Sequence, residues 1–376
     1  MSRRILLAAA AALALAGGTA APAAAQSCSA PSFVEQGFPT TAAQKKTAWR
    51  LCWAAEPGWG VYVRAAEFRR SPTSPWVRVF YDARVSEIFV PYHAGSPRYY
   101  DFEDYGFDLA TLNTNDCPAS AGGTLLGAAK QVCKQVRGRG LSWRSSSGVY
   151  RGEELVLWGA VAAANYYYII EWTFRDDGVV MGRFGATGTN LPSSPTMAHM
   201  HNAMWRLDID LNGAANDNVQ REVHTENLPG ATATDTHPAV TQESSLAWDD
   251  LRFGAVSIGD TGLKNGRGSF TRYHLMPERT GTARHQEPWT GADFWVTRYN
   301  PTEMRPTGLP GYINPPGSVS NTDVVLWYWG SVHHHFRDED GVFSNNGNAF
   351  SGVAQVMWTT FILKPMNLFD APPFWP

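Results

Sequence analysis

The sequence predicts an all-β fold: one large antiparallel β-sandwich with a short N-terminal extension. Three observations lead to this class. Aromatic residues make up 12% of the 376 residues and charged residues only 17%, and aromatic side chains favour strands. Glycine and proline number 35 and 24, as a chain with many tight turns requires. Apolar runs bounded by turn residues recur along most of the chain, which is typical of a sandwich.

The chain divides into three parts. Residues 1–25 combine basic residues, an apolar stretch and small residues before Gln26, the pattern of a secretory signal peptide. Residues 26–75 form the N-terminal extension, which has no clear period, and 41–55 is its best helix candidate. Residues 76–376 form the sandwich. Its clearest expected strands are 76–92, 153–163, 165–174, 178–184, 204–211, 293–299, 323–332 and 355–365.

A signal peptide predicts a secreted or periplasmic protein, exported by the Sec or the twin-arginine route. Four cysteines follow it, and an even number in an exported chain indicates disulfides. The economical pairing is Cys28 with Cys52 and Cys117 with Cys133. The formal net charge of −3 argues against nucleic acid as the main partner. No later segment reaches the roughly 20 apolar residues that a membrane span needs.

Five of the ten histidines fall into two groups. His199 and His201 lie two residues apart on an expected strand, so both rings point to one face, as two ligands of one transition metal would. The second group is 333–335, at the end of another strand. One imidazole from it would complete the three-nitrogen site that copper or zinc accepts. Taken alone, the pair could equally be a polar, solvent-facing strand, and the second group a solvated loop.

Acidic residues form a second constellation. Asp208 and Asp210 alternate just after the histidine pair, and Asp323 opens the strand that leads to the second histidine group. Carboxylates together with main-chain carbonyls are the ligands that calcium prefers. Solvated strand faces are the alternative explanation.

Three consecutive tyrosines raise a further question. On a strand, Tyr166 and Tyr168 share one face and Tyr167 takes the other. Packing is the simpler explanation, because aromatic residues carry large burial energies. The other explanation is that one of these rings takes part in chemistry.

Taken in order, these features resemble the catalytic domain of the copper amine oxidases, from about residue 78 to 373. The family has patterns such as SEMVVPYG, GNYDY, HQH followed by RLDMDIDG, LWVTRY and HxPRxED. The segments that resemble them are SEIFVPY with SPRYYDFEDYG (86–106), ANYYY (164–168), HMHNAMWRLDIDLNG (199–213), DFWVTRYN (293–300), DVVLWYWGSVHHHFRDED (323–340) and FILKPMNLFD (361–370).

The resemblance implies roles for individual residues. Tyr166, which follows Asn165, would be the precursor of the quinone cofactor topaquinone. His199 and His201 would be the first two copper ligands. His334 would be the third, because the family spacing counted from the strand tryptophan and from the Glu-Asp pair arrives there both times. The other implied positions are Asp101 (catalytic base), Tyr92 (hydrogen bond to the cofactor ring), Tyr99 (aromatic gate), Asp208, Ile209, Asp210, Asp323 and Val324 (calcium), and Cys117 with Cys133 (disulfide).

The function implied is oxidative deamination of a primary amine, in which amine, water and O2 give aldehyde, ammonia and hydrogen peroxide. Copper and topaquinone would be the cofactors, with a structural calcium, and the protein would be a homodimer acting on a small or peptidyl amine. One departure stands out: Tyr167 takes the place of the family's acidic residue. This departure leaves a copper-binding homologue that forms no topaquinone as one alternative. An aromatic-rich β-sandwich binding module is a separate alternative.

Overall fold

The structure is a computed structural model. It describes residues 28, 32–92, 97–225, 230, 232, 234–249, 252, 254–282, 284–341 and 353–371. The expected signal peptide, 1–25, lies outside the described residues. Within the described ranges, no helix has the length and apolar character needed to cross a membrane.

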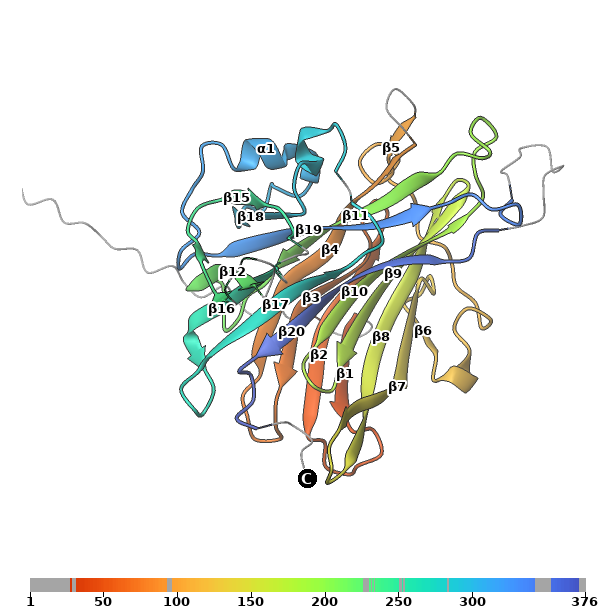
Figure 1. Ribbon diagram of the computed structural model, residues 1–376. Coiled ribbons are helices and arrows are strands. Elements are labelled where there is room, and N and C mark those ends of the chain that lie inside the picture. The colour runs from red at the N-terminus through yellow and green to blue at the C-terminus, as the bar shows by residue number, and fades with distance from the viewer. Residues whose placement is uncertain are drawn as a thin grey trace, which may run out of the picture.

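The expected all-β sandwich is confirmed: two antiparallel sheets lie face to face (Figure 1). Sheet A has the order β1 (Phe33–Phe38), β2 (Thr47–Glu56), β3 (Gly60–Arg69), β4 (Val77–Pro91), β11 (His199–Asp208), β19 (Val324–His334), β18 (Phe294–Arg298) and β15 (Ser244–Leu246), with β5 (Arg98–Tyr100) paired to β4.

Sheet B has the order β13 (Thr234–Thr236), β12 (Asp217–Thr225), β16 (Ala255–Lys264), β17 (Phe270–Glu278), β20 (Met357–Met366), β10 (Val180–Gly188), β9 (Tyr166–Arg175), β8 (Val149–Ala163), β7 (Val132–Arg144) and β6 (Thr124–Leu126). In addition, β14 (Ala239–Val240) pairs with β12. The helical pieces in the described ranges are single turns: η1 (Ala119–Ala121), η3 (Pro288–Thr290), η4 (Pro306–Gly308) and α1 (Leu309–Tyr312).

Aromatic contacts join the two sheets through the core. Trp172 of β9 meets Phe80 of β4 at 6.1 Å and Trp205 of β11 at 5.1 Å between ring centroids, and Trp205 also meets Phe361 of β20 at 5.2 Å. All four side chains are fully buried. Each such burial stabilises the fold by about 1.5–3 kcal/mol, so these rings fix how the sheets face each other.

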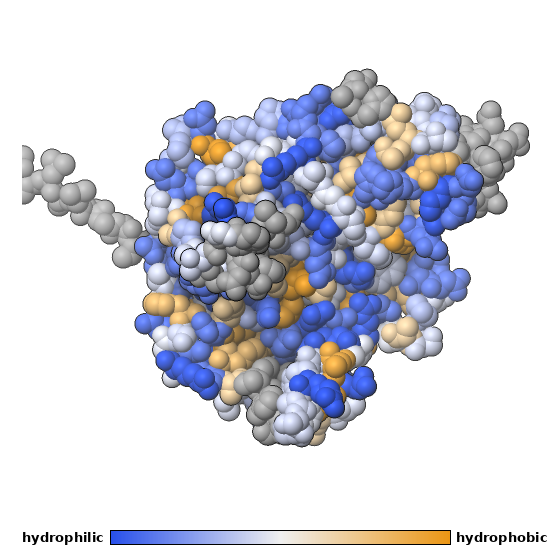
Figure 2. All heavy atoms as spheres, in the orientation of Figure 1, coloured by the Kyte–Doolittle hydropathy of each residue, from blue (hydrophilic) through white to orange (hydrophobic). Residues whose placement is uncertain are grey.

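The outer face of sheet A is also covered. Met204 of β11 and Trp327 and Trp329 of β19 pack in a second cluster with Trp289 and Leu309 from the short helical turns. Strands β11 and β19 are therefore buried on both faces, which holds them rigidly at the centre of the sheet. The face of the molecule seen in Figure 2 is mostly hydrophilic, with small hydrophobic patches between.

The helix expected within 41–55 is wrong, because residues from Thr47 onward form β2. Trp49, Leu51 and Trp53 alternate and enter the main core, a period of two that outweighs the helix-forming residues around them. Cys52 pairs with Cys28, and Cys117 pairs with Cys133, so both expected disulfides are present. The segment 26–75 supplies β1, β2 and β3 to sheet A.

Candidate metal centre and adjoining cavity

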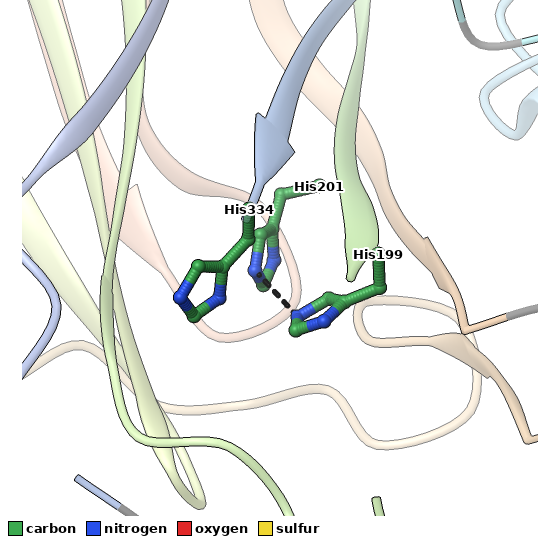
Figure 3. A group of neighbouring side chains, drawn as sticks. All are labelled: His199, His201 and His334. Carbon is green, nitrogen blue, oxygen red and sulfur yellow. Dashed lines mark hydrogen bonds between the residues drawn. The ribbon is translucent and has the colours of Figure 1, made fainter. Parts of the chain in front are cut away.

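Three histidines converge at one end of the β11–β19 strand pair. His199 and His201 lie on the core face of β11, and His334 of β19 stands opposite His199 in register. Their ring nitrogens lie within 4.8 Å of one another, and the rings point toward a common space (Figure 3). The neighbouring His333 and His335 contact each other, with centroids 3.7 Å apart, and do not belong to this group.

All three rings are neutral at pH 7. Burial lowers the pKa of His199 to about 4, although the carbonyl of Met197 opposes this shift. Burial also lowers the pKa of His201 well below its usual value and lowers that of His334. Neutral imidazoles carry a free lone pair, which is what a metal ion requires of a ligand.

Ring nitrogens approach one another closely in this group. Nε2 of His199 lies 3.1 Å from Nε2 of His201, and Nδ1 of His199 faces the carbonyl of Met197 at 3.1 Å. Nδ1 of the fully buried His201 has no partner among the described residues. With its proton on Nδ1 toward that carbonyl, His199 presents a lone pair at Nε2. The donor set therefore fits a metal that prefers imidazole, such as copper or zinc.

The Asp340 carboxylate contacts His334 on the ring nitrogen that faces away from the other two histidines. Oδ2 of Asp340 lies 3.3 Å from Nε2 of His334, and Nη2 of Arg337 donates to Oδ1 of Asp340 at 2.6 Å. Burial alone would raise the pKa of Asp340, but the bonds with Arg337 and His334 lower it. An ionised Asp340 holds the proton of His334 on Nε2, so that Nδ1 presents its lone pair to the centre.

Tyr166 reaches this centre from the opposite sheet. Its hydroxyl oxygen lies 2.8 Å from Nδ1 of His334, 3.2 Å from Nε2 of His199 and 3.3 Å from Oδ1 of Asn190. Burial raises the pKa of the Tyr166 phenol, and the neighbouring Tyr92 adds to the shift. The ring is only 2% exposed. Without a nearby cation, the phenol stays protonated.

Local backbone features place this tyrosine at the start of β9. Ala164 and Asn165 form the tight turn between β8 and β9, with Ala164 at φ 51°, and the Asn165 amide donates to the carbonyl of Thr189 at 2.6 Å. Gly188 of β10 pairs with Tyr166 of the neighbouring strand β9. A Cβ at Gly188 would lie 2.7 Å from the Tyr166 ring, so only glycine leaves room for it.

A cavity of about 140 Å³ opens beside Tyr166. Asp101 lines it, is 5% exposed and accepts a hydrogen bond from the Tyr168 hydroxyl at 2.7 Å. Burial raises the pKa of Asp101 to about 7, against the lowering effect of the Tyr168 bond. The Glu87 side chain accepts hydrogen bonds from the backbone N–H groups of Phe102 and Glu103, at 2.8 and 3.0 Å, and so fixes the chain that follows Asp101. Asp101 is thus a carboxylate poised to exchange a proton near neutral pH.

The other predicted tyrosines lie next to each other beside this cavity. Tyr92 stacks on His199 with centroids 4.2 Å apart and meets Tyr99 edge-on at 6.0 Å. Both line the cavity, as does Asn165. Tyr167 points to the outer face of sheet B and is 52% exposed, so the residue that departs from the family pattern does not reach the centre.

The acidic constellation gathers at the other end of β11 and β19. Carboxylate oxygens of Asp208, Asp210 and Asp323 lie within 4.8 Å of one another, and Asp208 pairs with Val325 at the strand ends. Both oxygens of the fully buried Asp208 lack a hydrogen-bond partner in the described ranges, although Nη1 of Arg206 lies 3.8 Å away. Ile209 adjoins the cluster in sequence and is fully buried, as is Val324.

Asp217 was not among the predicted site residues, yet it is fully buried near this cluster, and neither of its oxygens is hydrogen-bonded in the described ranges. Burial and the charges of Asp210, Asp323, Asp260 and Asp208 raise its pKa to about 10. Asp340, Asn190 and Glu87 were also missed. Of these three, only Asp340 could have been found from the sequence, because it is the Asp of the Glu-Asp pair from which His334 was counted.

Comparisons with known proteins agree with the family resemblance seen in the sequence. A family model described as "Copper amine oxidase, enzyme domain" matches residues 134–375. The primary amine oxidase of Pisum sativum is 22% identical and covers 79% of this chain and 54% of that protein. For amine oxidase [copper-containing] gamma 2 of Arabidopsis thaliana the identity is 26%, with coverage of 91% and 60%. The chain thus spans little more than half the length of these relatives.

Solved structures show the same fold. The copper-containing benzylamine oxidase from Hansenula polymorpha aligns with a TM-score of 0.70 at 18% identity, covering 91% of this chain and 62% of that one. The lysyl oxidase of Pichia pastoris aligns with a TM-score of 0.66 at 17% identity, covering 88% and 53%.

Proposed function

This chain belongs to the copper amine oxidase family, and we propose that it oxidises a primary amine with copper and topaquinone. The products would be an aldehyde, ammonia and hydrogen peroxide. One observation carries the proposal: the Tyr166 hydroxyl lies within hydrogen-bond distance of two of three converging, neutral histidines. The single phenol of this set is therefore the group best placed to be modified by a metal held there.

His199 and His201 through Nε2, and His334 through Nδ1, would hold copper. When bound, copper would supply the oxidising centre that converts Tyr166 to topaquinone in air, and the quinone would supply the electron acceptor for the amine. Asn190 accepts a hydrogen bond from the Tyr166 hydroxyl and so helps to hold it, and Tyr92 supports His199 by stacking on its ring.

Asp101 is the proposed catalytic base. It lies in the same cavity as Tyr166, where it would take a proton from the substrate carbon beside the nitrogen. A raised pKa of about 7 makes it a stronger base than an exposed carboxylate, and still ionised in part at neutral pH. Tyr168 fixes its orientation, since its hydroxyl donates to Oδ2.

The exposed position of Tyr167 supports formation of the cofactor despite the departure from the family pattern, because a residue on the outer face makes no contact with the three histidines. Export remains part of the proposal, supported by the two disulfides. Assembly as a homodimer is proposed from family membership alone.

The direct test is turnover. Protein reconstituted with copper in air should release peroxide and ammonia from a primary amine, while metal-free protein and His201→Ala should not. Protein that binds one copper but never gains a visible hydrazine-reactive chromophore would instead be the silent homologue, and the oxidase proposal would fall.

Asp340→Asn is expected to weaken copper binding by about 10–100-fold, because the amide no longer fixes the His334 proton on Nε2. Copper affinity can be measured by competition with a chelator of known affinity, and the copper electron paramagnetic resonance spectrum should change. Glu339→Gln, an exposed neighbour, is the matched control. An unchanged affinity and spectrum in Asp340→Asn would show that the carboxylate does not position this ligand.

We also propose that Asp208, Asp210 and Asp323, with the carbonyls of Ile209 and Val324, hold a structural calcium ion. The buried carboxylate of Asp208, which has no hydrogen-bond partner in the described ranges and only a distant ion pair with Arg206, supports this, because a buried carboxylate needs close partners. Oxygen-only ligands favour calcium over copper.

Calcium added to chelator-treated protein should therefore raise the melting temperature by several degrees, since an ion that binds only the folded state stabilises it. Asp323→Asn should abolish this rise, and the exposed Asp235→Asn should retain it. If calcium leaves the melting temperature of the chelated wild type unchanged, these carboxylates hold no calcium.

A further inference from the structure

The β11–β19 strand pair carries a second group of metal-binding residue types beside the three core-facing histidines. Met200 lies between the two histidines of β11, and His333 and His335 lie on either side of the third. Successive side chains on a strand point to opposite faces, so Met200 and His333 belong to the outer face of sheet A. We call Met200, His333 and His335 the outer group, and the three core-facing histidines the inner group.

The register of the two strands brings the first two members of the outer group together. Met204 and Trp329 are opposed residues of β11 and β19 that pack in the cluster on the outer face of the sheet. Further along the same face, Met200 and His333 form another opposed pair. The Cβ atoms of such a pair lie about 4.5–5.5 Å apart, so a thioether and an imidazole can reach one ion between them.

His335 brings a second imidazole to this pair. It follows directly after the end of β19, and its ring centroid lies 3.7 Å from that of His333. His335 is exposed, and Met200 and His333 are half-buried, so an ion can enter from solvent. Nδ1 of His333 makes no hydrogen bond in the described ranges, so no neighbouring group there competes with an ion for this nitrogen.

Residues 280–281 pack against the same two side chains. The Thr280 N–H donates to the carbonyl of Ser331 at 3.3 Å, and the His333 N–H donates to Oγ1 of Thr280 at 3.4 Å. A Cβ at Gly281 would lie 3.3 Å from Sδ of Met200, so the glycine backbone lies close to the thioether. This segment therefore confines Met200 and His333 to one small region of the outer face.

We propose that the outer group binds one cuprous ion, through Sδ of Met200 and one ring nitrogen from each of His333 and His335. A thioether is a soft ligand that selects Cu(I), and imidazole also suits copper. The group contains no carboxylate, so calcium and magnesium have no oxygen ligands in it. Cupric ion and zinc gain little from a thioether, so in air the inner group remains the place for a single cupric ion.

The test separates the two groups by metal. Copper-free protein is first given one equivalent of zinc, which three imidazoles accept and which undergoes no redox chemistry. Cuprous ion, kept reduced by ascorbate without oxygen, is then titrated in competition with a cuprous chelator of known affinity. The wild type should retain its zinc and bind one cuprous ion, and the X-ray absorption spectrum of the copper should contain a sulfur scatterer.

Substitutions then assign the ligands. Met200→Leu should remove the sulfur signal and weaken cuprous binding by at least about tenfold, a loss that even a supporting group outside the ligand set can cause. His333→Gln and His335→Gln should weaken binding to a similar degree. Met204→Leu removes a buried thioether from the same face, and His224→Gln removes an exposed histidine of β12; both should bind as the wild type does.

The wild-type spectrum decides the matter even where a variant folds poorly. A copper spectrum with nitrogen and oxygen scatterers alone would overturn the inference, and so would equal affinity in the wild type and Met200→Leu. Release of zinc as copper binds, again without sulfur, would place the ion in the inner group and leave the outer group without a metal. None of these readouts involves turnover, so the oxidase proposal stands or falls separately.

Discussion

Tyr166→Phe is expected to abolish the hydrazine-reactive chromophore and to lower amine oxidation by at least about 10³-fold. The variant lacks only the hydroxyl oxygen that lies 2.8 Å from Nδ1 of His334 and 3.2 Å from Nε2 of His199. Phenylalanine fills the same buried volume, so the fold should persist. The three imidazoles also remain, and the variant should still bind one copper.

The measurement is a phenylhydrazine titration of protein expressed without copper, before and after copper is added in air. Wild-type protein should develop a visible adduct only after copper is added. Tyr167→Phe and Tyr167→Asp are the matched controls. Both alter the neighbouring ring, which is 52% exposed on the outer face of β9, and both should keep adduct yield and activity within about twofold.

Two outcomes would contradict this assignment. An adduct that survives in Tyr166→Phe would place the carbonyl on another residue. An adduct that forms only in Tyr167→Asp would show that the departure from the family motif, despite its exposed position, blocks cofactor formation in the natural chain.

Asp101→Asn is expected to lower kcat by about 10²–10⁴-fold, the usual contribution of a positioned general base. The side chain lies in the same cavity as Tyr166 and is held by Tyr168. Asparagine keeps the shape and can accept the Tyr168 bond but cannot take up a proton. Copper content and hydrazine adduct should remain normal, because neither depends on this carboxylate.

The pH profile provides an independent check. Only ionised Asp101 can act as a base, so kcat at saturating amine should rise with pH and level off above about pH 7. The profile of Asp101→Asn should lack this limb, and Asp101→Glu should restore part of the activity. A kcat within threefold of wild type in Asp101→Asn would remove this residue from the mechanism.

Stability should separate a catalytic loss from unfolding. The pKa of Asp101 is raised on folding from near 4 to about 7, so the folded state holds the proton more tightly and this group makes the fold less stable as pH rises across that range. Asp101→Asn carries no buried charge. Its melting temperature at pH 8 should therefore not fall below that of the wild type.

Local patterns in the sequence predicted much of the sandwich. Strand period is a short-range property, and the expected strands at 165–174 and 323–332 correspond to β9 and β19. The first strands were missed, because Trp49, Leu51 and Trp53 alternate within a stretch of helix-forming residues. There the pairing of β2 with β1 and β3 decides the conformation, and such pairing cannot be predicted from the residues of β2 alone.

For the candidate site, the sequence by itself predicted the imidazole residue types and the placement of His199 and His201 on one strand face, and the spacing implied by the family resemblance singled out His334. These depend on the two-residue repeat of a strand and on motifs that run along the chain. Only the tertiary structure decided that Tyr166 of sheet B meets these histidines of sheet A, that Asp340 supports His334, and that Tyr167 turns outward. The physical reason is that these contacts join residues far apart in sequence, and the packing of two sheets around a common aromatic core brings them together.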